Sequence, residues 1–270
     1  MASEIITGSS LAAAVGVKLI YDVCGPTAKY WGGELTAYSK IGAENVRRIF
    51  ENAAHRLKTI GKFEGQVPPR VLKAILSDGY YCEDELQALY LGGVLASSKG
   101  PVSRDDRAIA YCSLVNSLSS YQLRTHCIIY SALLRATHFK VGGTLTPIKA
   151  LNTYWINKHG LTVAIREVDY QLAMDFSTPE QPANIGQHSF VGLEEKGLCK
   201  GGVNVCQPQD KNEEPFRYFY PTLLGIELFL WGLGIGDYGL EEYRPELLKK
   251  TVLPFVVTPY ETHAGHVSFS

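Results

Sequence analysis

The stretch that decides the fold runs from Ser189 to Gly236 and reads SFVGLEEKGLCKGGVNVCQPQDKNEEPFRYFYPTLLGIELFLWGLGIG. Its first part has the apolar spacing of a helix. Gly197 is placed to end that helix, because glycine adopts the left-handed C-cap conformation without a steric clash. Two β-prone runs follow, Val203–Cys206 and Phe216–Tyr220. The polar segment between them, QPQDKNEE, predicts the solvated tip of a hairpin.

A second helix follows this hairpin. Pro221 and Thr222 open it, and apolar side chains at helical spacing continue to Leu233. A helix ended by glycine, a two-stranded wing and a helix entered through proline are typical of the end of a winged-helix domain. Such a fold does not by itself define what the domain binds.

The composition is that of an ordinary globular protein. Its 270 residues are 46% hydrophobic, and 26 basic residues nearly balance 27 acidic ones. No whole-molecule charge therefore directs the chain to nucleic acid or anionic lipid. The six cysteines do not complete a zinc site, and no secretory leader is recognised. We expect reduced thiols, no cofactor, and a cytoplasmic protein that contacts the inner membrane at most peripherally.

Residues 1–138 are predicted to form a helical array. Start and stop signals indicate helices at about 43–60, from Pro69 to Gly79, from about Cys82 to Leu95, at about 105–118 and at about 121–135. Residues 139–270 are predicted to form a winged-helix-like α+β region with a C-terminal tail. In it, 163–168 is interpreted as a strand of a small mixed sheet, and 170–176 as either a strand or a short helix. The expected fold class is therefore mainly α with a small β component.

The helix predicted at about 43–60 is both amphipathic and basic. Its apolar face is accompanied by Arg47, Arg48, Arg56 and Lys58. Such a face can contact a partner, a phosphate group or a membrane surface. The alternative is a packed helix whose basic side chains are only solvated. This second interpretation is favoured, because most runs of charge are solvated faces.

Five segments carry a resemblance to a known family. They are YDVCGPTAKYWGGEL from Tyr21, VPPRVLKAILSDGYYCEDELQALYLGGVLASS from Val67, AIAYCSLVNSLSSYQLRTHCIIYSALL from Ala108, FVGLEEKGLCK from Phe190 and FRYFYPTLLGIELF from Phe216. In this order they resemble the Abi-alpha family of bacterial abortive-infection proteins. The resemblance implies a role in defence against phage, by stopping the infected cell. It implies no catalytic residues.

No chemical motif indicates an enzyme. The sequence has no nucleophile elbow, no phosphate-binding glycine loop and no HExxH motif. His126 and Cys127 are neighbours on a predicted helix and point apart, so we expect a hydrogen-bonded core histidine. His263 and His266 have a spacing that a metal site can use, but Gly265 between them argues against an ordered site. We therefore expect no catalytic and no metal-binding residues.

Two functions of different classes remain, and a catalytic defence effector ranks third. The first is a non-enzymatic defence protein that acts through a protein partner, self-association or a membrane surface. The second is a winged-helix regulator of a defence locus that binds nucleic acid. The candidate contacts of its recognition helix and wing are His188, Lys196 and Lys200. Because Glu194 and Glu195 lie beside them, the positive charge is too small for strong phosphate contacts, and tight binding of duplex DNA is not expected.

Overall fold

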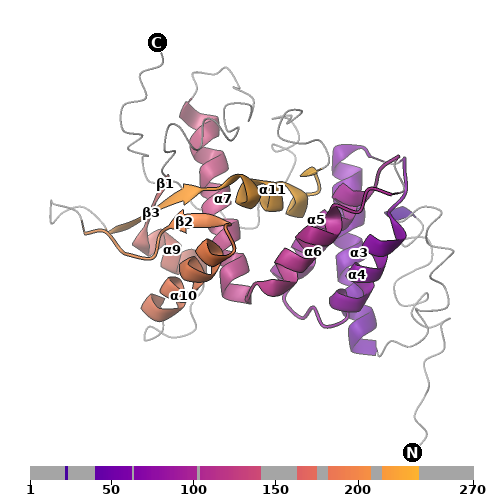
Figure 1. Ribbon diagram of the computed structural model, residues 1–270, viewed down its shortest axis with the longest axis horizontal. Helices are drawn as coiled ribbons and strands as arrows, with labels where there is room; N and C mark the ends of the chain where they lie inside the picture. Colours follow the sequence, from indigo (N-terminus) through magenta and orange to yellow (C-terminus); the bar gives the residue numbers. More distant parts are fainter. Residues whose placement is uncertain are drawn as a thin grey trace, which may run out of the picture. The chain divides into compact units, whose positions relative to one another are not determined.

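The computed structural model describes residues 22–23, 40–62, 64–101, 104–140, 163–174, 182–207 and 215–236. These residues form eight helices and three strands (Figure 1). The helices are α3 (Lys40–Ile60), α4 (Pro69–Gly79), α5 (Glu85–Ser98), α6 (Ala108–Ser117), α7 (Ser120–Lys140), α9 (Glu167–Met174), α10 (Pro182–Glu195) and α11 (Leu223–Gly232). The strands are β1 (Val163–Arg166), β2 (Cys199–Gly201) and β3 (Phe216–Pro221). The expected fold class, mainly α with a small β component, is confirmed.

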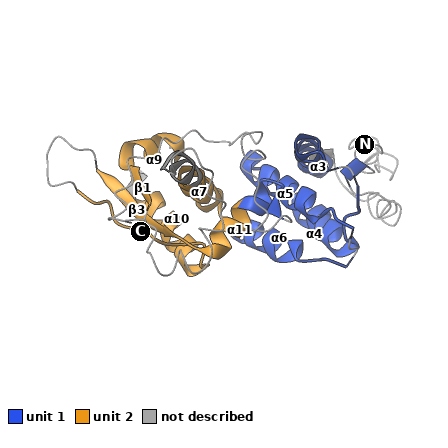
Figure 2. Cartoon of the chain, turned by 90° about the horizontal axis from the view of Figure 1, so that it is seen from above, with its two compact units in different colours: residues 1–117, 230–237, 246–251 blue, residues 118–229, 238–245, 252–270 orange. Residues whose placement is uncertain are grey.

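The chain divides into two compact units, which Figure 2 colours separately. Among the described residues, the first unit comprises those up to Ser117 and those from Leu230 onward, and the second comprises Leu118 to Phe229. The expected boundary near residue 138 lies at the end of α7, whereas the contacts divide the chain before α7. The expected C-terminal tail, with His263 and His266, lies outside the described residues.

Helix α5 forms the core of the first unit. All of its residues from Tyr90 to Ser98 are buried, which requires small side chains where other elements approach. At Gly92 a Cβ atom would lie 2.8 Å from the carbonyl oxygen of Ile49 on α3. At Gly93 it would lie 1.8 Å from the carbonyl oxygen of Gly232, at the end of α11. Helix α5 is therefore packed directly against the backbones of α3 and of the end of α11.

Capping residues fix where the helices begin. Asp84 accepts a hydrogen bond from the backbone N–H of Gln87 at 2.8 Å and so caps α5. At the start of α7, the Ser119 hydroxyl oxygen accepts from the N–H of Gln122 at 3.2 Å, while the Gln122 Oε1 accepts from the N–H of Ser119 at 3.0 Å. Ser119 therefore caps α7, and Gln122 completes a capping box.

Among the described residues, the elements of the second unit follow one another in the chain as α7, β1, α9, α10, β2, β3 and most of α11 (Figure 1). The sheet has the order β1-β3-β2, and both pairings are antiparallel. Helices α7 and α9 pack on β1, and α10 packs on β2. The predicted strand is confirmed over Val163–Arg166, and the segment that was ambiguous is α9 for most of its length. The described sheet is antiparallel rather than mixed.

Helix α10 ends at its predicted glycine. Gly197 has a positive φ of 68°, and its N–H donates to the carbonyl of Glu194 at 2.9 Å. The N–H of Leu198 donates to the carbonyl of Leu193 at 2.8 Å, which completes a Schellman cap. This cap turns the chain directly into β2.

The hairpin has the predicted antiparallel pairing but a different first strand. That strand was predicted at Val203–Cys206 and lies instead at Cys199–Gly201. Gly201 and Gly202 have positive φ values of 73° and 83°, so the chain turns out of the ladder after them. Pairing with β3 resumes at a single bridge at Cys206. The predicted strand is therefore wrong except at its last residue.

Candidate functional site

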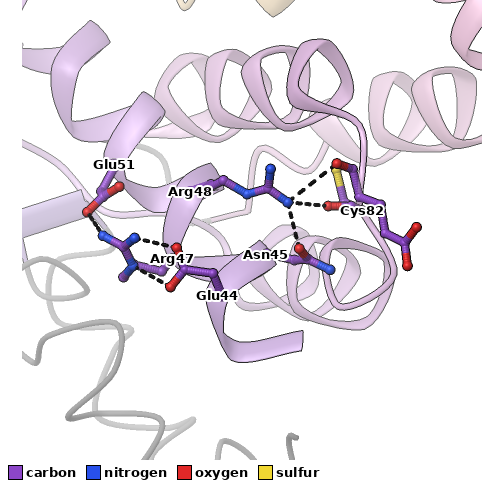
Figure 3. Close-up of polar contacts among 7 residues, drawn as sticks. Glu44, Asn45, Arg47, Arg48, Glu51 and Cys82 are labelled. Carbon is purple, nitrogen blue, oxygen red and sulfur yellow. Dashed lines mark hydrogen bonds and ion pairs between the residues drawn. The ribbon is translucent and has the colours of Figure 1, made fainter. Parts of the chain in front are cut away.

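The first candidate surface is the basic helix, α3. Arg47 lies between two carboxylates of the same helix, Glu44 and Glu51, and forms ion pairs with both (Figure 3). Its Nε also donates to Glu44 at 2.8 Å. The hydrogen bond from Arg47 holds the pKa of the Glu44 carboxyl below its usual range. Two acidic groups therefore surround this cation, and it does not present an isolated positive charge.

Arg48 forms hydrogen bonds with the loop between α4 and α5. Its Nη2 donates to the Asn45 side-chain oxygen at 2.6 Å and to the backbone carbonyl of Cys82 at 3.2 Å (Figure 3). The Asn45 amide in turn donates to the carbonyl of Tyr80 at 2.9 Å. These bonds attach the loop between α4 and α5 to the start of α3.

The two remaining basic residues of α3 lie in different environments. Lys58 is exposed, but only 4% of Arg56 is exposed, so the expectation that it belongs to a solvated basic face is wrong. The physical reason is that the chain beyond α11 returns to this side of α3. A Cβ atom at Gly234 would lie 3.0 Å from the Cβ of Arg56. The four basic residues therefore do not form one exposed basic surface, and their contact with a partner stays a prediction.

The second candidate surface is the exposed side of α10, which we call the α10 face. Its exposed residues are Asn184, Gln187, His188, Val191, Glu194 and Glu195. Val191 is 37% exposed, which leaves an apolar group among polar ones. Beyond the helix, Lys196 is half-buried and Lys200 is exposed on β2. The predicted candidates His188, Lys196 and Lys200 therefore lie in one region, but only His188 belongs to the α10 face.

Gln122 on α7 fixes the orientation of His188. Its Oε1 accepts from the N–H of Ser119, so its Nε2 is the atom that faces His188, with the two nitrogens 3.4 Å apart. An amide nitrogen only donates, so the His188 Nε2 accepts and the ring proton of the neutral histidine lies on Nδ1. Because α7 packs closely on α10, a Cβ at Gly192 would lie 2.0 Å from the same amide, so a side chain there would displace it from His188.

A buried ion pair holds the hairpin to α9. Arg217 on β3 is 2% exposed and pairs with Glu167, the first residue of α9, through its Nε and its Nη2. Its Nη1 donates to the carbonyls of Gly202 and Val203, each at 2.9 Å. These are carbonyls of the segment that has left the β ladder. The guanidinium therefore donates to two carbonyls that have no strand partner after the chain turns at the glycines. The Tyr170 ring lies beside the guanidinium, with its centroid 5.4 Å from the Arg217 Cζ.

A second buried group joins α7 to both ends of the hairpin. The Tyr130 hydroxyl donates to the carbonyl of Leu198 and accepts from the N–H of Thr222 at 3.1 Å. One turn earlier, the Nε2 of His126 donates to the carbonyl of Gly225 at 3.1 Å. The prediction of a hydrogen-bonded core histidine is confirmed. Burial lowers the pKa of His126 to about 3, so the ring stays neutral when the chain is folded.

This histidine predicts a dependence of stability on pH. The pKa of His126 is lowered to about 3 in the folded chain, against about 6.5 when unfolded. Between these values the unfolded chain binds a proton that the folded chain does not, so the free energy of unfolding rises with pH, by at most about 1.4 kcal/mol per unit. Urea titrations between about pH 5 and 6.5 measure this slope. The variant His126→Gln is expected to have a flatter slope, and parallel slopes would contradict the assignment.

The described residues offer little reactive chemistry. Burial raises the pKa of the thiols of Cys82, Cys112 and Cys199 to about 12 in each case. These thiols are therefore protonated at neutral pH and are poor nucleophiles. In the part of the chain that the structure describes, no three His, Cys, Asp or Glu side chains gather as a metal site would require. None of the helices described there has the length and apolar character needed to cross a membrane.

Sequence reasoning found the charges of the α10 face but not the groups that position it. Arg217 lies in the alternating run FRYFY at a position that faces the core, and Glu167 directly follows β1, whose first three residues are buried. A charged residue at a position that is expected to be buried indicates an ion pair, because an unpaired buried charge is unfavourable.

The chain matches no family model, no curated protein and no solved structure.

Proposed function

We propose that this protein is a non-enzymatic anti-phage defence protein whose second unit is a winged-helix module that binds a protein partner through the α10 face. The defence role rests on the resemblance of five segments to the Abi-alpha family. The module rests on the order of its elements. The choice of partner rests on the charges of α10. We place this activity in the cytoplasm.

The chain order supports a winged-helix module. Among the described residues, a helix, a strand, two helices and a hairpin follow one another as α7, β1, α9, α10 and β2 with β3. The first strand joins the hairpin on its β3 side, which gives the order β1-β3-β2. We assign α9 and α10 to the helix-turn-helix pair of such a module, with α10 as the second helix, the one that such modules use for recognition.

One observation carries the choice of a protein partner: α10 contains no lysine and no arginine between Pro182 and Glu195. Its exposed face carries amides, an imidazole, Val191 and two carboxylates. Binding to duplex DNA is dominated by cations that neutralise phosphates, and this face does not supply them. An exposed apolar group with hydrogen-bonding neighbours fits a protein interface. The nucleic-acid regulator is therefore the weaker candidate.

A phage-protection assay tests the proposal. Bacteria that express the chain are expected to resist a susceptible phage, and the double variant Gln187→Ala, Val191→Ser is expected to lose this protection. Both side chains are exposed, so the free energy of unfolding should change by less than about 0.5 kcal/mol. The matched control is Arg47→Gln with Lys58→Gln on α3, which should still protect.

Three outcomes decide between the parts of the proposal. If the wild-type chain protects against no phage in a broad panel, the defence role is wrong. If the folded α10 variant still protects, the α10 face is not the binding surface. If the wild-type chain binds duplex DNA more tightly than about 10⁻⁷ M at physiological salt, the partner is nucleic acid instead.

A further inference from the structure

We infer that the partner of the α10 face is a second copy of this chain, bound with the two α10 helices antiparallel and a twofold axis at Val191. This inference rests on the proposed function, because it names the partner of the surface assigned there. It is carried by the positions and charges of five residues along about two turns of helix.

Val191 lies at the centre of the exposed arc. Successive residues of a helix are about 100° apart, so Gln187 and Glu194 lie on one side of Val191. His188 and Glu195 lie on the other side by the same count. All five are on the α10 face. Each side of the face therefore carries one hydrogen-bond donor before Val191 and one carboxylate after it.

An antiparallel second copy matches these groups pair by pair. A twofold axis at Val191 exchanges the two directions along the helix and keeps each side of the face on its own side. At about 1.5 Å per residue, Gln187 then lies level with Glu194 of the second copy to within about one residue. His188 lies opposite Glu195 of the second copy in the same way. The two Val191 side chains meet at the axis, so one patch is complementary to itself, as a twofold interface requires.

The hydrogen-bonding state of the donors agrees with this arrangement. The Nε2 of His188 accepts from Gln122, which leaves the Nδ1 proton of the neutral ring to donate. The amide of Gln187 also donates, whereas an ionised carboxylate only accepts. Donor and acceptor therefore face each other at four places across the axis.

The carboxylates also lack compensation within one chain. Glu194 and Glu195 lie in the last turn of α10, where the negative end of the helix dipole disfavours further negative charge. Neither forms an ion pair with any residue that the structure describes. In the antiparallel pair they face the Gln187 amide and the His188 imidazole of the second copy, which can donate hydrogen bonds to them. A second copy thus supplies donors to two carboxylates.

The interface is small, so dimerisation must be measured at high protein concentration. Interfaces of less than about 1,200 Å² are weak, so sedimentation should be followed up to about 100 µM of full-length chain. We expect the wild-type chain to sediment as a dimer at the upper concentrations. A wild-type chain that remains monomeric throughout overturns the inference.

Paired charge variants make the test specific. The acceptor variant carries Glu194→Lys and Glu195→Lys, and the donor variant carries Gln187→Glu and His188→Glu. Each alone is expected to dimerise at least about tenfold more weakly, because like charges then face each other or a cation faces a donor. An equal mixture should recover dimer as the heterodimer, since lysines of one variant then face glutamates of the other. A mixture that stays monomeric contradicts the antiparallel arrangement.

A control variant removes the effect of net charge. Glu64→Lys with Glu83→Lys makes the same charge change at exposed positions of the first unit and should dimerise like the wild type. Equal weakening of dimerisation in this control would overturn the inference.

The inference and the proposed function can be tested separately. A monomeric chain whose α10 variants still lose protection has another protein partner, and a dimeric chain whose α10 variants still protect uses this face for assembly only.

Discussion

Replacing Arg217 alone with methionine is expected to lower the free energy of unfolding of the second unit by about 3–5 kcal/mol, because it leaves the Glu167 carboxylate buried without its partner. The same change removes the donor from the two carbonyls of the hairpin segment, those of Gly202 and Val203. Urea titration followed by circular dichroism measures the loss. Hydrogen exchange at the amides of β3 assigns it to the second unit.

The double variant Glu167→Met, Arg217→Met is the control for this prediction. It removes both charges, so no unpaired charge stays buried, and we expect it to be more stable than the single variant. A single variant that loses less than about 1 kcal/mol would show that water or another group compensates Glu167 when Arg217 is absent. In that case the ion pair would not be what holds the hairpin to α9.

The change Gly93→Ala is expected to lower the free energy of unfolding of the first unit by about 3 kcal/mol. In the interior of a helix this change normally stabilises by about 1 kcal/mol, so the expected sign is reversed. The reason is the distance of 1.8 Å between the added Cβ and the carbonyl oxygen of Gly232. The backbone there cannot move freely, because the Ser97 hydroxyl donates to the carbonyl of Trp231 and accepts from the N–H of Gly236, each at 3.1 Å.

Gly100→Ala is the matched control for Gly93→Ala. No atom lies within 4 Å of a Cβ added at Gly100, so its stability should stay within about 0.5 kcal/mol of the wild type. Thermal or urea unfolding of the two variants side by side measures the difference. If Gly93→Ala is as stable as its control, the backbone at Gly232 does not approach α5 as closely as described.

The local part of the fold was predictable from sequence because its signals are local. Gly197 ends α10 and Ser119 caps α7, and each acts within a few residues of its position. The first hairpin strand was misplaced because the run at Val203–Cys206 has high β-propensity, whereas the backbone follows Gly201 and Gly202. Glycine conformation outweighed side-chain propensity at this place.

The groups that position the candidate surface could not be predicted from local sequence patterns. Arg217 and Glu167 are separated by 50 positions, and periodicity does not pair residues at such a distance. The burial of Arg56 depends in the same way on Gly234, which comes far later in the chain. The low positive charge of α10 can be read from its composition alone, and weak binding of duplex DNA stays a prediction.

The hydrogen bonds of the Tyr130 hydroxyl can form only late in the synthesis of the second unit. Its two backbone partners, at Leu198 and Thr222, lie 68 and 92 positions later in the chain. A ribosome adds about 5–20 residues per second, so several seconds separate the appearance of α7 from that of its last partner. During this interval the apolar side of α7 has no sheet or hairpin to cover it. We therefore expect chaperones to bind the nascent chain mainly after α7 has emerged from the ribosome and before Thr222 has emerged.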